Sequence, residues 1–158
     1  MSIDQIISPR AIIPALKAAT EKSVTLALSK KASAISGLES SEIADALLNQ
    51  KQDAKQHISF GVAILQITSE NTTSSHAIFA RLAAGIDFTS VDGEPVDLVL
   101  LLIMGKSPTN RHLQTLAETS RLFRNKALCK KLRGSTTADA IYALLTGYAK
   151  KGLQRESI

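Results

Sequence analysis

The sequence has little of several features that define particular classes of protein. It has a single cysteine, Cys129, and no tryptophan among 158 residues, and aromatic residues make up 4% of it. One cysteine excludes an internal disulfide framework and suits a reducing compartment. The longest apolar run, 98–104, is far shorter than the roughly 18 residues of a membrane span. Because the amino terminus also lacks the basic region of a signal peptide, we expect a cytoplasmic protein without membrane insertion.

Positive charge is unevenly distributed along the chain. The formal net charge is +5, but residues 1–118 hold 10 Lys+Arg against 12 Asp+Glu, whereas residues 119–158 hold 9 against 2. Such a basic segment suits nucleic acid, an acidic protein or an anionic membrane surface, and it is also typical of a solvated helical face. Because aromatic rings for base stacking are scarce, we do not expect nucleic acid as a partner. An acidic protein suits the segment better, although a solvated face explains it most simply.

Short apolar segments alternate with helical patterns, which indicates an α/β protein. We expect a single domain over residues 1–158, a sandwich in which helices cover both faces of a mixed β-sheet of about five strands. The clearest strand is 96–104, which is nearly all apolar and suits the centre of the sheet. Further strands are predicted at 11–13, 61–65 and 76–82, the last of them from its alternating pattern.

Capping residues mark several helix ends. Thr20 can cap a helix that ends at Gly37, and Asn125 can cap one that ends at Gly134. Ser107-Pro108 is typical of the start of a helix, and a last helix is predicted after residues 135–137. Apolar spacing predicts the buried side chains of two helices. They are Ile43, Leu47 and Leu48 in the helix that begins near Ser40, and Leu113, Leu116, Ala117, Ser120 and Phe123 in the helix after Pro108.

The sequence contains no motif of well-defined chemistry. There is no phosphate-binding glycine loop, no Cys/His metal-ligand spacing and no Gly-x-Ser-x-Gly elbow, so we expect neither a cofactor nor a metal. The three histidines, His57, His76 and His112, are far apart in the chain. A lone histidine is more often a surface or hydrogen-bonded residue than a catalytic one, so composition and pattern alone indicate only an α/β domain.

Cys129 is the one side chain with a possible thiolate chemistry. Lys130 and Lys131 lie beside it, and nearby cations lower the pKa of a thiol. Its helical spacing from Leu128 and Leu132 places it among buried side chains, however, so we predict a structural role.

Four segments, in order, resemble one protein family. They are 61–64 (Gly-Val-Ala-Ile), 86–88 (Ile-Asp-Phe), 91–98 (Val-Asp-Gly-Glu-Pro-Val-Asp-Leu) and 112–117 (His-Leu-Gln-Thr-Leu-Ala). The series is similar to the type-2 EIIA domain of the bacterial phosphoenolpyruvate-dependent phosphotransferase system, which the mannitol and fructose EIIA domains share with the nitrogen-regulatory EIIA protein. The resemblance covers about residues 6–145. A free-standing chain of this length most resembles the nitrogen-regulatory member.

The resemblance implies a phosphoacceptor position at Gln66. In the family a histidine ends a Gly-Val/Ile-Ala-x-Pro-His motif and takes the phosphoryl group from the histidine-containing phosphocarrier protein. Here residues 61–66 read Gly-Val-Ala-Ile-Leu-Gln, with Leu65 in place of the proline. An amide nitrogen has a delocalised lone pair and cannot act as this nucleophile. Gln66 can still donate and accept hydrogen bonds as an unphosphorylated histidine does.

Other positions of the implied site are altered or retained. The family's arginine and Gly-Ser-Thr turn fall on residues 49–60, where Gln50 and Gln52 replace basic residues and Ala54-Lys55-Gln56 replaces the turn. Arginine suits phosphate because its planar guanidinium binds two oxygens at once. His112 matches the family's second active-site histidine, which assists the phosphoacceptor. The resemblance thus implies a site that has lost its nucleophile and kept its assisting histidine.

Two functions follow from this resemblance. The first is a regulatory protein that binds its partners in the unphosphorylated-like form and is not competent in phosphotransfer. Partners of such relatives include sensor kinases, potassium transporters and metabolic enzymes. The second is an active phosphocarrier that receives the phosphoryl group on His112 or on another histidine, such as His57.

Overall fold

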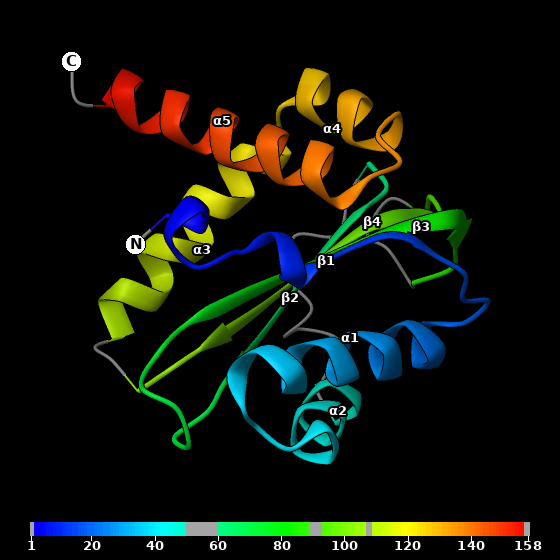
Figure 1. Cartoon of the computed structure of the whole chain (residues 1–158), viewed down its shortest axis with the longest axis vertical. Coiled ribbons are helices and arrows are strands. Elements are labelled where there is room, and N and C mark those ends of the chain that lie inside the picture. Colours follow the sequence, from blue (N-terminus) through cyan, green and yellow to red (C-terminus); the bar gives the residue numbers. More distant parts are fainter. Residues whose placement is uncertain (1, 50–59, 89–92, 107–108, 157–158) are drawn as a thin grey trace.

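The fold is built on a mixed β-sheet. The computed structural model describes residues 2–49, 60–88, 93–106 and 109–156 (Figure 1). Within these residues the sheet has four strands, β1 (Ile12–Leu16), β2 (Val62–Thr68), β3 (His76–Ile86) and β4 (Val96–Met104), in the order β1-β3-β4-β2. β3 and β4 are antiparallel, whereas β1 with β3 and β2 with β4 are parallel. The mixed sheet is confirmed, with four strands where about five were expected.

The central strands are buried on both faces. Eight of the nine residues of β4 are buried, and only Asp97 is half-buried. The strand predicted at 76–82 is confirmed within β3, and its residues 77–80 are all fully buried, so both of its faces are covered there. A strand covered by helices on both sides has no solvent face and needs no polar positions.

Helices form the two outer layers of the sandwich. In Figure 1 α1 (Glu21–Ser36) and α2 (Ser40–Leu48) lie below the sheet, while α3 (Thr109–Phe123), α4 (Lys126–Arg133) and α5 (Ala138–Glu156) lie above it. Two short 3₁₀ helices, η1 (Ile3–Gln5) and η2 (Pro9–Ala11), precede β1. Helices on both faces of the sheet are as expected. No helix in the described part of the chain is long and apolar enough to cross a membrane.

The predicted caps of two helices are confirmed. The Thr20 hydroxyl accepts a hydrogen bond from the Ser23 amide at 3.1 Å, which satisfies a free amide of the first turn of α1. Gly37 ends this helix in the left-handed conformation, with φ of 81°. The Asn125 carboxamide caps α4 in the same way by accepting from the Leu128 amide at 3.1 Å.

The predicted burial of three helix residues is wrong. Leu48 is 45% exposed, Leu113 is 63% exposed, and Ala117 is exposed as well. In α3 the polar Thr115 and Thr119 are buried instead. Each threonine hydroxyl donates to the carbonyl four residues earlier, at 2.9 and 2.7 Å, so burial leaves neither hydroxyl without a partner.

Candidate functional site

The strand register places Gln66 on the face of the sheet that α3 covers. Gln66 of β2 pairs with Leu102 of β4, which pairs in turn with Ala77 of β3. Paired residues point to the same face of a sheet, and so do residues two apart in a strand. Phe79, two residues after Ala77, stacks on Phe123 of α3 with ring centroids 6.0 Å apart. Gln66 therefore points to the α3 side.

His112 lies at the same end of the sheet as Gln66. Its Nε2 atom is 3.0 Å from the carbonyl oxygen of Gly105, the residue that follows β4. β2 and β4 are parallel and in register up to Thr68 and Met104, so their carboxyl ends coincide. The structure thus brings the two predicted site residues to one end and one side of the sheet.

The two side chains differ in what they can do chemically. Gln66 is half-buried, and its amide can donate and accept hydrogen bonds without offering a nucleophilic nitrogen. The carbonyl of Gly105 can only accept, so Nε2 of His112 carries the hydrogen of this bond. In the neutral ring the lone pair then lies on Nδ1. Only His112 of this pair offers a nitrogen nucleophile, and only through Nδ1.

The other histidines are not brought to this site by the described structure. His76 pairs with Ile103, the neighbour of Leu102, and therefore points to the opposite face of the sheet from Gln66. Partial burial lowers the pKa of His76, which keeps the ring neutral at neutral pH. His57 lies outside the described residues, as do Gln50, Gln52, the segment 54–56 and Ser107-Pro108.

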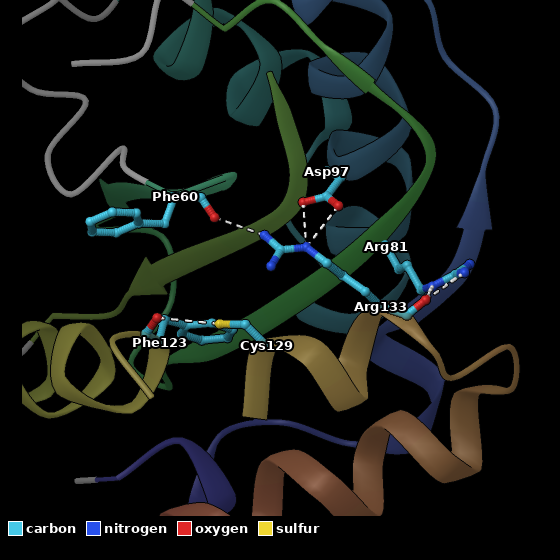
Figure 2. A network of polar contacts seen from close by, with 6 residues as sticks. All are labelled: Phe60, Arg81, Asp97, Phe123, Cys129 and Arg133. Atoms are coloured by element: carbon cyan, nitrogen blue, oxygen red, sulfur yellow. Dashed lines mark hydrogen bonds and ion pairs between the residues drawn. The ribbon is translucent and has the colours of Figure 1, made fainter. Parts of the chain in front are cut away.

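An ion-pair network at the opposite end of β2 was missed by the sequence reasoning (Figure 2). Arg133, the last residue of α4, places its Nε 2.8 and 3.1 Å from the two carboxylate oxygens of Asp97. Its Nη2 donates to the carbonyl of Phe60 at 2.8 Å. Gly61 lies beneath this pair with φ of +80°, and a Cβ there would lie 2.5 Å from Arg133 Nη2 and 2.9 Å from Asp97 Oδ1. The network fixes where β2 begins.

Arg81 of β3 connects the same network to the rest of the sheet. Its Nε and Nη2 donate to the Arg133 carbonyl at 3.0 and 2.8 Å, and its Nη1 donates to the Pro14 carbonyl at 3.1 Å. The last carbonyls of a helix have no partner within the helix, and a cation suits the negative end of the helix dipole. One guanidinium therefore joins β1, β3 and the end of α4, as Figure 2 shows for its bonds to Arg133.

Cys129 lies inside the packed face of α4. Its side chain is buried, and Sγ lies 3.3 Å from the carbonyl oxygen of Phe123. Burial raises the pKa of the thiol, and this outweighs the opposite effect of the Arg133 charge. A buried thiol with a raised pKa is a weak nucleophile, which supports the predicted structural role. In the described part of the chain no three His, Cys, Asp or Glu side chains gather to hold a metal ion.

Solved structures of IIA proteins share this architecture. The crystal structure of nitrogen regulatory protein IIA-Ntr from Neisseria meningitidis superposes with a TM-score of 0.84, covering 91% of this chain and 99% of that one at 22% identity. The crystal structure of IIA mannitol from Escherichia coli has a TM-score of 0.72, with 87% and 97% covered at 16% identity. The fold is thus that of a phosphotransferase-system IIA domain.

Sequence comparison assigns the chain to a family. The family described as "Phosphoenolpyruvate-dependent sugar phosphotransferase system, EIIA 2" matches residues 5–148, and the chain belongs to it. The chain is 37% identical to the nitrogen regulatory protein of Bradyrhizobium diazoefficiens over 145 aligned residues. The aligned region covers 92% of this chain and 95% of that protein. The nitrogen regulatory protein of Escherichia coli is 28% identical over 103 residues, which is 65% of this chain and 63% of that protein.

Proposed function

We propose that this chain is a cytoplasmic regulatory protein of the nitrogen-regulatory EIIA type that does not accept a phosphoryl group at the usual position. The observation that carries the proposal is the amide of Gln66, on the α3 side of the sheet at the end where His112 lies. The similarity to nitrogen regulatory proteins over nearly the whole chain supports the regulatory role.

The chemistry of the amide is the physical basis of this proposal. Phosphoryl transfer to nitrogen needs a lone pair that can form the new P–N bond, and the lone pair of an amide is delocalised into its carbonyl. Gln66 can make the hydrogen bonds of a neutral imidazole but cannot carry the phosphoryl group. The protein would therefore present its partners with a permanently unphosphorylated surface.

The partners we propose are proteins that recognise the surface around Gln66 and His112. Candidates are sensor kinases and potassium transporters. The histidine-containing phosphocarrier protein is a further candidate, which would bind this chain without transferring a phosphoryl group to it. A IIA mannitol protein of Escherichia coli forms a complex with phosphorylated enzyme IIB, which shows that a protein of this fold can bind a protein partner.

Phosphoryl labelling tests the proposal directly. The chain is incubated with labelled phosphoenolpyruvate, the first enzyme of the system and the phosphocarrier protein. An EIIA domain with an intact Gly-Ile-Ala-x-Pro-His motif serves as the positive control in the same reaction. We expect acid-labile label on the control and none on this chain. Stoichiometric label on this chain would contradict the proposal.

One contact favours a second candidate function, that of a phosphocarrier whose phosphoacceptor is His112. The bond from His112 Nε2 to the Gly105 carbonyl orients the ring and leaves the Nδ1 lone pair as the reactive one. If His112 accepted the phosphoryl group there, label would appear on the natural chain and disappear in His112→Gln. His76→Gln and His57→Gln are the matched control variants, because each removes one of the other imidazoles. If label were lost only in His57→Gln, His57 would be the phosphoacceptor instead.

A further inference from the structure

The last turn of α3, α4 and the part of α5 up to residue 151 carry an unbalanced positive charge. From residue 121 to residue 151 the chain has eight Lys or Arg residues and a single acidic one, Asp139. Seven of these eight cations are exposed, and the eighth, Arg133, is half-buried in its pair with Asp97. Like charges on neighbouring helices repel each other, so these helices favour an anionic partner.

Two of these cations converge on the ring of Tyr148. The Nζ atoms of Lys131 and Lys151 lie 5.4 and 5.5 Å from its centroid, and Lys131 Nζ also donates to the Tyr148 hydroxyl at 3.0 Å. Within the described residues neither lysine has a carboxylate partner. The cation–π contacts hold both ammonium groups in place without neutralising them. Their position leaves them ready to bind carboxylates.

A hollow of about 420 Å³ opens beside this pair of lysines. It lies between η1, α3 and α5, which are neighbours in Figure 1. Ile3, Leu122 and Tyr148 line it with apolar atoms, and the charged side chains that line it are Glu118, Arg121 and Lys151, two cations against one carboxylate. Its volume is sufficient for a large apolar side chain, and pockets with apolar walls and a few polar groups are typical of binding sites.

We propose that this hollow and its lysines form a docking site for an acidic protein segment. The segment would insert one apolar side chain between η1, α3 and α5 and place carboxylates against Lys131 and Lys151. The charge and the apolar walls together select this occupant, because an anchor in a pocket with charged groups around it is the usual form of a protein contact. The site goes beyond the proposed function, because Lys151 and Tyr148 belong to α5. The α3 residues of the hollow, Glu118 to Leu122, lie about 9–15 Å along the helix from His112.

The aromatic side chains argue against nucleic acid on this surface. Single strands bind by stacking bases on uncovered rings. The ring of Tyr148 is covered by two lysines, and the exposed ring of Phe60 has the Lys126 ammonium 5.5 Å from its centroid. A phosphate backbone would also leave the apolar hollow unfilled. A protein segment uses both parts of the site.

Fluorescence anisotropy with designed peptides tests this site. The probe is a short labelled peptide rich in glutamate with one central leucine, measured at about 50 mM salt where screening is weak. Two control peptides replace the glutamates by glutamine or the leucine by alanine. We expect each control to bind at least about tenfold more weakly than the probe. No binding of the probe below about 1 mM, or equal binding of the leucine and alanine peptides, would overturn the proposal.

Variants of the full chain locate the binding. Two variants should each lower the affinity for the probe at least about tenfold. K131E/K151E reverses the charge of both lysines, and G152F fills the hollow from a helix position where a side chain meets nothing within 4 Å. The matched control K22E/K30E changes two exposed lysines of α1 and should leave the affinity unchanged. Thermal melts establish that each variant folds. Tighter binding of a duplex DNA than of the probe, lost in K131E/K151E, would assign the surface to nucleic acid and contradict the proposal. None of these outcomes depends on whether the chain accepts phosphate.

Discussion

The two ends of strand β2 are held by different kinds of contact. At the amino end, Arg133 binds the Asp97 carboxylate and the Phe60 carbonyl directly above Gly61, and Arg81 binds the Arg133 carbonyl in turn. At the carboxyl end, Nε2 of His112 donates to the Gly105 carbonyl, and Gln66 lies half-buried on the same side of the sheet.

This difference separates the residues that build the fold from the position that would carry chemistry. The amino end requires specific residues. Arg133 and Asp97 pair there so close to Gly61 that a Cβ at this position would lie within 3 Å of both side chains. The ladder between β2 and β4 at Gln66 is made by backbone groups and requires no particular side chain. A glutamine can therefore stand at position 66 without loss of the fold, whereas phosphoryl transfer needs a nucleophilic side chain there.

The largest effect is expected from Gly61→Ala at the amino end of β2. Its Cβ would meet Arg133 Nη2 at 2.5 Å, so the guanidinium must move and give up part of the Asp97 pair, and φ of +80° is strained for alanine. We expect a loss of about 2–3 kcal/mol in the free energy of unfolding, measured by urea denaturation.

Gly37→Ala is the matched control for this variant. Gly37 has nearly the same φ, +81°, but a Cβ there would meet nothing within 4 Å. The variant should lose only about 1 kcal/mol, the cost of the left-handed conformation. Equal losses in the two variants would show that the network over Gly61 contributes nothing to stability.

A somewhat smaller effect is expected from Arg81→Met. The variant keeps much of the side-chain volume and removes three hydrogen bonds to the carbonyls of Arg133 and Pro14. Charged hydrogen bonds of this kind should contribute about 2 kcal/mol to the free energy of unfolding. Arg124→Met, at an exposed position, should change it by less than about 0.5 kcal/mol. Similar changes in the free energy of unfolding for both variants would show that the hydrogen bonds of Arg81 do not stabilise the fold.

His76→Gln should change how stability depends on pH. Burial lowers the pKa of His76 in the folded chain, so the unfolded chain binds a proton more readily. This contribution to stability is present above the unfolded pKa of about 6.5 and is lost as the pH falls through it towards the lower folded pKa. Urea denaturation at pH 7.5 and at pH 5.5 should therefore show a smaller difference for the variant than for the natural chain. If the difference between the two pH values were the same for the variant and the natural chain, the pKa of His76 would be the same in the folded and unfolded states.

The smallest effect is expected from Gln66→His at the carboxyl end. Backbone pairing is unchanged, so the free energy of unfolding should change by less than about 1 kcal/mol. Phosphoryl label should stay at least about tenfold below that of an EIIA domain with the intact motif, because Leu65 and the altered segment before it leave the geometry of transfer incomplete. Full labelling would show that position 66 alone prevents the reaction.

Much of the fold could be predicted from local sequence signals. The ends of α1 and the start of α4 follow from Thr20, Gly37 and Asn125, whose side chains or conformations act within a few residues. Burial along α3 could not be predicted in this way. Apolar spacing favoured Leu113, but threonines that bond back to their own helix can be buried without penalty, and this depends on how the helix packs.

The candidate site was only partly predictable from the sequence. Gln66 and His112 were identified by resemblance, and the strand register then places them on one side and at one end of the sheet. The pair of Arg133 with Asp97 spans 36 residues of sequence, and Arg81 reaches Arg133 across 52. No local pattern marks such contacts, because they exist only once the strands and α4 have packed together.

The central claim is that this chain keeps the EIIA fold and accepts no phosphoryl group, because Gln66 stands at the phosphoacceptor position. The most direct test is the incubation of the natural chain with labelled phosphoenolpyruvate, the first enzyme and the phosphocarrier protein, beside an EIIA domain whose motif ends in histidine. We predict acid-labile label on that domain and none on this chain. Stoichiometric label on this chain would contradict the claim.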